Sequence, residues 1–149
     1  MDNFESRLEQ SGKNFREWCE HVNGLWKEAE ANALQISPGH PVVVEIKTVE
    51  PSYDSPPETP AVLHLLGFLK INDKWCIGYG LGPADLVEWW DHPWAWKPIL
   101  ECSLDQRLDA GKVLQKLLEK LVEAQEGLAA QAEDAAGAMA EALSKFHRT

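Results

Sequence analysis

A chain of 149 residues, 44% hydrophobic and 26% charged, has the size and composition of one globular domain. A chain of this length buries enough surface to fold without a disulfide or a structural metal. Its net charge of -10 argues against nucleic acid as a partner, since phosphate binding needs a cationic surface, and suits a neutral or basic protein instead.

The N-terminal segment MDNFESRLEQ has neither the basic start nor the apolar stretch of a secretion signal. No apolar run approaches the roughly 18 residues that a membrane-spanning helix needs. Cys19, Cys76 and Cys102 are odd in number and widely spaced, so no disulfide framework is expected. We therefore expect a cytoplasmic protein without a membrane partner, whose free thiols serve as small apolar side chains.

Residues 3–34 are predicted to form one amphipathic helix, with Gly12 and Gly24 as candidate kinks. Apolar side chains recur every three or four residues, so they lie along one face. They are Phe4, Leu8, Phe15, Trp18, Val22, Leu25 and Ala29, with Ser11 as the one polar member. The sequence Ser-Pro-Gly at 37–39 ends the helix, because proline cannot continue it and glycine accepts turn conformations.

A strand is expected at 41–50, where Val42, Val44 and Ile46 point to one face. The segment EPSYDSPPETP that follows has four prolines among eleven residues, so it forms neither a helix nor a strand ladder. We predict a solvated, mobile loop at 50–60.

Residues 61–81 are predicted to form a β-hairpin, because two apolar runs flank Asn72 and Asp73, which suit a two-residue turn with positive φ. That turn fixes which residues lie opposite one another. One face pairs Lys70 with Trp75, Phe68 with Ile77, Leu66 with Tyr79 and His64 with Leu81. The other face pairs Leu69 with Cys76, Gly67 with Gly78 and Leu65 with Gly80. The first face is bulky and the second is a strip of small residues, and an amphipathic helix is expected to cover each.

The segment after the hairpin is rich in tryptophan. A short helix is expected at 83–90, and an edge strand near 94–100, since Pro98 is tolerated only at a sheet edge. The indoles are those of Trp89, Trp90, Trp94 and Trp96. They suit a protein contact, because tryptophan is enriched at interface hot spots. Alternatively they enclose a cation together with neighbouring carboxylates, or cover the sheet. At least one of the last three is expected to be exposed.

The C-terminal helix is predicted to begin at a capping box formed by Ser103 and Gln106. Apolar residues then recur at steps of three and four along one face. They are Leu114, Leu118, Leu121, Leu128, Ala132, Ala135, Met139, Ala142 and Phe146. A single helix over 104–146 would be about 65 Å long, about twice the diameter of such a domain. Either it breaks near Gly127 into a helical hairpin, or it stays long or kinked and pairs with another chain. The unbroken apolar phase favours the second.

Beyond Leu128 the apolar face narrows to alanines and Met139, which suits close contact between helices. We therefore predict that residues 128–146 are an oligomerisation or partner-binding segment. Leu128, Met139 and Phe146 are its expected contact residues.

No catalytic motif is present. The glycines at 78–82 fail the dinucleotide-binding spacing, because Pro83 stands in place of the third glycine. The histidines lack the spacing of metal ligands, and there is no nucleophile elbow. If the chain has a ligand or catalytic pocket between sheet and helices, His64, Asp91 and His92 are its candidate residues.

The sequence thus predicts an α+β fold: an antiparallel sheet of three or four strands between an N-terminal amphipathic helix and a long C-terminal helix. The expected function is that of a non-enzymatic interaction protein, such as an adaptor, an inhibitor or immunity-type protein, or a subunit of a complex. It would act through the tryptophan-rich segment and the C-terminal helix, as a homodimer or with another protein. The alternative is a small enzyme or ligand-binding domain. No cofactor and no metal are expected.

Overall fold

The computed structural model describes residues 2–84 and 95–147. It confirms an α+β fold, in which the chain begins and ends with a long helix and the residues between these helices in sequence form an antiparallel sheet. The helices are α1 (Asp2–Gln35), the short 3-10 helix η1 (Ile99–Glu101), α2 (Leu104–Gly111) and α3 (Leu114–His147). The strands are β1 (Val42–Val49), β2 (Val62–Ile71), β3 (Lys74–Pro83) and β4 (Ala95–Pro98).

The sheet has the order β1-β2-β3-β4, and each strand is antiparallel to its neighbour. The predicted hairpin is confirmed residue by residue, from the pair His64 with Leu81 to the pair Lys70 with Trp75. Asn72 and Asp73 have φ angles of 52° and 64°, as a two-residue turn of this kind requires. Pro98 lies on the edge strand β4, as predicted from the confinement of proline to the edges of sheets.

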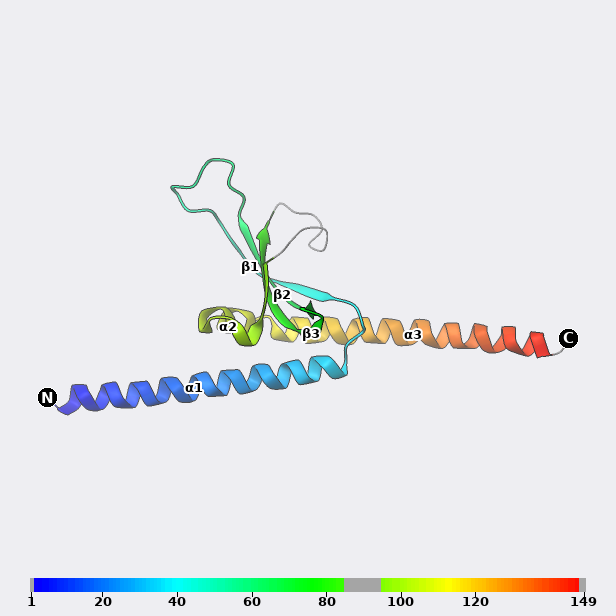
Figure 1. Cartoon of the computed structure of the whole chain (residues 1–149), viewed down its shortest axis with the longest axis horizontal. Coiled ribbons are helices and arrows are strands. Elements are labelled where there is room, and N and C mark those ends of the chain that lie inside the picture. The colour runs from blue at the N-terminus through cyan, green and yellow to red at the C-terminus, as the bar shows by residue number, and fades with distance from the viewer. Residues whose placement is uncertain (1, 85–94, 148–149) are drawn as a thin grey trace.

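All the helices pack on one face of the sheet, the bulky one (Figure 1). α1 lies against β3, and α3 lies against β1 and β2. Leu66, Phe68, Ile77 and Tyr79 form the sheet side of this core and are almost completely buried. The expectation of one helix on each face is therefore wrong for the described part of the chain.

The strip of small residues on the other face is covered by side chains of the sheet itself. The ring of Trp96 lies over Gly80 and Gly67, where an added Cβ would come within 2.8 Å and 3.2 Å of ring atoms. β4 pairs with β3 so that Trp96 is directly opposite Gly80, which places the indole on the glycine surface. A flat ring from the neighbouring strand thus occupies the space that we expected a helix backbone to fill.

The C-terminal helical region has a turn, but not at Gly127. The capping box of Ser103 and Gln106 is confirmed at the start of α2. α2 ends at Gly111, a turn follows, and Val113 is buried in the core as α3 begins. α3 then runs unbroken through Gly127 to His147, a length of about 51 Å at about 1.5 Å per residue.

The loop at 50–61 contains neither helix nor strand, in accord with its prolines. It forms two turns, closed by backbone hydrogen bonds from Ser55 to Ser52 and from Thr59 to Pro56.

Candidate interaction surface

Both long helices extend well past the sheet that covers them. One face of the C-terminal third of α1 is buried, with Trp26 only 3% exposed and Ala29 and Ala33 also in the core. The same apolar face continues toward the N-terminus, but there Trp18 is 65% exposed, and Phe4, Leu8 and Phe15 are similarly open. We call residues 4–21 the α1 arm. Its exposed face carries large apolar side chains of the kind that usually lie in a protein core.

α3 repeats this arrangement in reverse. Its first turns are buried, with Leu117 and Leu121 fully inaccessible to solvent. The apolar face then continues in the same phase past the edge of the sheet, where Met139 is 65% and Phe146 74% exposed. We call residues 128–146 the α3 arm. In Figure 1 the two arms project from opposite ends of the molecule.

A chain of shallow apolar hollows joins the α1 arm to α3. The first, of about 280 Å³, lies between α1 and α2 and is lined by Phe15, Trp18, Cys19, Val22, Leu104 and Leu108. The second, of about 200 Å³, shares Val22 and Leu108 with the first. The third, of about 610 Å³, shares Gly111 and Leu114 with the second and follows α3 along Leu118 and Val122. Because neighbouring hollows share lining residues, they follow one another along the helices, and we call this row of hollows the groove.

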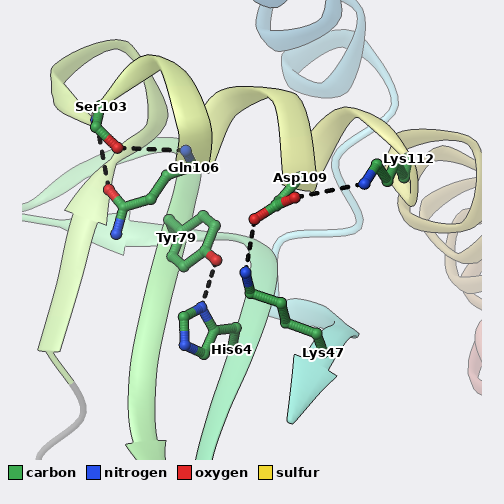
Figure 2. Close-up of polar contacts among 7 residues, drawn as sticks. All are labelled: Lys47, His64, Tyr79, Ser103, Gln106, Asp109 and Lys112. Atoms are coloured by element: carbon green, nitrogen blue, oxygen red, sulfur yellow. Dashed lines mark hydrogen bonds and ion pairs between the residues drawn. The ribbon is translucent and has the colours of Figure 1, made fainter. Parts of the chain in front are cut away.

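The polar contacts nearest to a catalytic arrangement involve His64, one of the predicted ligand residues (Figure 2). Its Nδ1 lies 2.5 Å from the hydroxyl oxygen of Tyr79. Burial and the positive charge of Lys47 lower the pKa of His64, and burial raises the pKa of Tyr79 to about 12. At neutral pH both groups are therefore uncharged and share one hydrogen bond.

Beside this pair, Lys47 on β1 donates a hydrogen bond to Asp109 on α2, with Nζ 2.7 Å from Oδ2 (Figure 2). That hydrogen bond holds the pKa of the Asp109 carboxyl below its usual value. Lys112 approaches the other carboxylate oxygen at 3.5 Å. The contact between Lys47 and Asp109 fastens α2 to the sheet, while the one between Lys112 and Asp109 lies within the C-terminal turn of α2.

Comparisons with family models, curated proteins and solved structures found no match. Within the described ranges, no three His, Cys, Asp or Glu side chains are grouped so as to hold a metal ion. No described helix is both long enough and apolar enough to cross a membrane.

Other predicted site residues fall partly outside the described residues. Trp89, Trp90, Trp94, Asp91 and His92 all lie there. Trp96 is half-buried, and its ring packs on the sheet glycines as described above. Leu128, Met139 and Phe146 all lie on the exposed face of the α3 arm.

The cysteines take the positions expected of small apolar side chains. Cys76 and Cys102 are buried, and burial raises the pKa of both thiols, so they stay protonated. Cys19 is half-exposed at the border of the groove.

The exposed α1 arm is the main feature that sequence reasoning missed. Its apolar face was recognised, but it was interpreted as a face that packs on the sheet. The length of the helix indicates that part of it extends beyond the sheet, because 34 residues span about 51 Å, further than the strands beside them can cover. The same length argument, which we applied to the C-terminal helix, predicts an arm at the N-terminus as well.

Proposed function

We propose that this chain is a non-enzymatic protein–protein interaction module that binds its partner through the α1 arm and the α3 arm. The supporting observation is the apolar face of each long helix, which continues in phase from the buried core into solvent. Contiguous exposed apolar surface of this extent is uncommon on a monomer and marks a contact site.

The residue types on the arms also favour binding. Aromatic side chains are enriched among the residues that dominate interface energetics, and Phe4, Phe15, Trp18 and Phe146 are all more than half exposed. Methionine, as at position 139, adapts to an irregular partner surface. The tryptophans at 89, 90 and 94 remain candidates for an additional contact, but the proposal rests on the arms.

A small enzyme or ligand-binding domain is the weaker alternative. The first two hollows are lined mainly by leucine, valine and aromatic side chains, and the third adds Gln115, Glu119, Glu123 and Glu126, spaced along successive turns of α3. None of the three includes His64. A catalytic pocket needs a few convergent polar groups beside the apolar wall. His64 instead bonds to Tyr79, which is a structural use of both groups.

Matched pairs of glutamate substitutions test the proposal. Met139→Glu places a charge on the apolar face of the α3 arm, and its control, Ala138→Glu, places the same charge on the side of the helix about 100° away. Leu8→Glu and Ser6→Glu form the corresponding pair on the α1 arm. Each protein is chemically crosslinked twice, once purified and once in extract of its source cells, and the products are identified by mass spectrometry.

We expect specific crosslinked species with the wild type and with both controls, and their loss with Met139→Glu and Leu8→Glu. If the apolar-face variants crosslink to the same proteins as the wild type, the arms are not the contact surface. If the wild type crosslinks specifically to nothing in either setting, the interaction function itself is wrong.

A further inference from the structure

We infer that the partner is a second copy of this chain, in a dimer where the α1 arm of each subunit lies antiparallel along the α3 arm of the other. This inference rests on the proposed function and specifies its partner. It follows from the directions, the lengths and the side-chain sizes of the two arms.

Because of the direction of the helices, such a dimer covers all of its arms and leaves none free to bind a third subunit. α1 and α3 run the same way across the same face of the sheet, and their arms project at opposite ends (Figure 1). A two-fold axis perpendicular to the helices reverses the second copy, which brings its α3 arm to the α1 arm of the first, and the converse. Pairing of α1 arms alone leaves both α3 arms bare, and self-pairing at both ends builds an open chain of subunits. Only the exchange of unlike arms covers all four in a dimer.

The arms also match in length. Residues 4–21 extend about 27 Å and residues 128–146 about 28 Å, at about 1.5 Å per residue. In an antiparallel pair of this length, Phe4 at one end of the contact lies beside Phe146 of the second copy. Counting inward from that end by the same number of residues on each helix then pairs each remaining residue on the apolar face of the α1 arm with one on the apolar face of the α3 arm.

This alignment sets large side chains against small ones. The facing pairs are Leu8 with Ala142, Ser11 with Met139, Phe15 with Ala135 and Trp18 with Ala132. Inside the end pair of Phe4 and Phe146, each bulky residue of the α1 arm meets an alanine, and the one large residue in the middle of the α3 arm meets a serine. Close-packed helix contacts need this interdigitation of large and small side chains, which self-pairing of the α1 arm would not provide.

The contact between the α1 arm and the α3 arm of the second copy extends beyond Trp18 into the groove. One further step places Leu128 of the second copy beside Val22, which lines both hollows between α1 and α2. Leu108 and Leu25 stand exposed beside it and would be covered by the incoming helix.

The area available meets the requirement of a stable dimer. A fully buried aromatic side chain removes about 150–250 Å² from water, so the exposed parts of the four aromatic rings on the arms offer about 500 Å² per chain. Two chains offer about 1,000 Å² before any leucine or Met139 is counted. Specific protein interfaces bury about 1,200–2,000 Å² in total, a value that the aliphatic side chains bring within reach.

The first test measures the mass of the full-length protein by light scattering across a concentration series. We expect twice the 16.7 kDa of one chain. Phe15→Glu and Met139→Glu should each raise the dissociation constant at least tenfold, and Ser6→Glu and Ala138→Glu should change it less than twofold. Circular dichroism and thermal melting of each variant establish that its sheet and core remain folded.

The second test distinguishes exchange of arms from self-pairing. A dimer of Phe15→Glu alone, or of Met139→Glu alone, has a damaged residue in both contacts. A mixed dimer of the two variants places both damaged residues in one contact and leaves the other contact intact. Mixing should therefore restore dimers at concentrations where each variant alone is monomeric. Under self-pairing, every contact in the mixed dimer contains one damaged arm, and mixing restores nothing.

The outcomes separate this inference from the proposed function. A wild-type chain that is monomeric when pure but crosslinks to another protein through its arms in extract overturns the second copy as partner and keeps the interaction function. A dimer that fails the mixing test overturns the exchange of arms. Absence of any contact through the arms overturns both.

Discussion

Gly80→Ala provides a sharp test of how the sheet is covered on the side away from the helices. A Cβ at this position would lie 2.8 Å from three ring atoms of Trp96. Carbon atoms in good contact are about 3.5–4.0 Å apart, so the indole must move by about 0.7–1.2 Å. Trp96 is also the strand partner of Gly80, which means that this shift disturbs the pairing of β4 with β3.

The expected loss of stability follows from two opposing terms. Overpacking of this kind costs about 1–3 kcal/mol, and replacing a strand glycine with alanine returns about 0.5–1 kcal/mol of backbone entropy. The midpoints of these ranges give a fall in the free energy of unfolding of about 1 kcal/mol, which for a chain of this size lowers the melting temperature by about 2–4 °C. Urea unfolding followed by far-ultraviolet circular dichroism, at protein concentrations where the wild type is monomeric, measures it.

Gly127→Ala is the matched control, because a Cβ there meets nothing within 4 Å and the residue lies inside α3. It should raise stability by about 0.5–1 kcal/mol. If Gly80→Ala is as stable as the wild type while the control behaves as expected, Trp96 does not pack on the glycine strip and this description of the sheet fails.

Three further predictions concern the turn, the imidazole and the alignment of the arms. Asp73→Gly should stabilise the chain by about 0.5–1 kcal/mol, because glycine adopts the observed φ of 64° without strain; an unchanged urea midpoint would contradict the turn. The wild type should lose stability relative to His64→Gln as the pH falls below about 6.5, since the lowered pKa of His64 lets only the unfolded chain bind the proton there; parallel stability curves from pH 8 to 5 would refute it. In a Cys19→Ser background, Ser11→Cys together with Met139→Cys should form an oxidised dimer with a mild oxidant, because the alignment places these two positions opposite each other across the contact. A dimer that forms equally well with Met139→Cys alone would mean that α3 arms pair with each other.

The features that local chemistry determines could be predicted from the sequence. Asn72 and Asp73 specify a turn, the turn fixes the register of ten residue pairs, and Ser103 with Gln106 specifies the start of a helix. Each involves residues a few positions apart, whose conformational preferences decide the result without help from the rest of the chain.

The features that depend on distant residues were predicted less well. The periodicity of an apolar face is the same whether or not a sheet covers it, so Trp18 and Trp26 look alike in the sequence although one is exposed and the other buried. Likewise, Gly80 does not reveal whether a helix or an indole will cover it. That depends on the pairing of β4, a strand of four residues with a proline at its end.

The turn between α2 and α3 sets the direction of a long helix, so a small change of angle there produces a large displacement at the far end of α3. Val113 and Leu117, buried where α3 begins, set the angle at which the helix leaves the sheet, while Phe146 at the far end lies more than 40 Å away at about 1.5 Å per residue. A tilt of about 5° at the buried end therefore displaces the tip by about 4 Å, close to the width of a side chain. A conservative change in the core at Val113, such as Val113→Ala, would redirect the α3 arm without touching any residue on it.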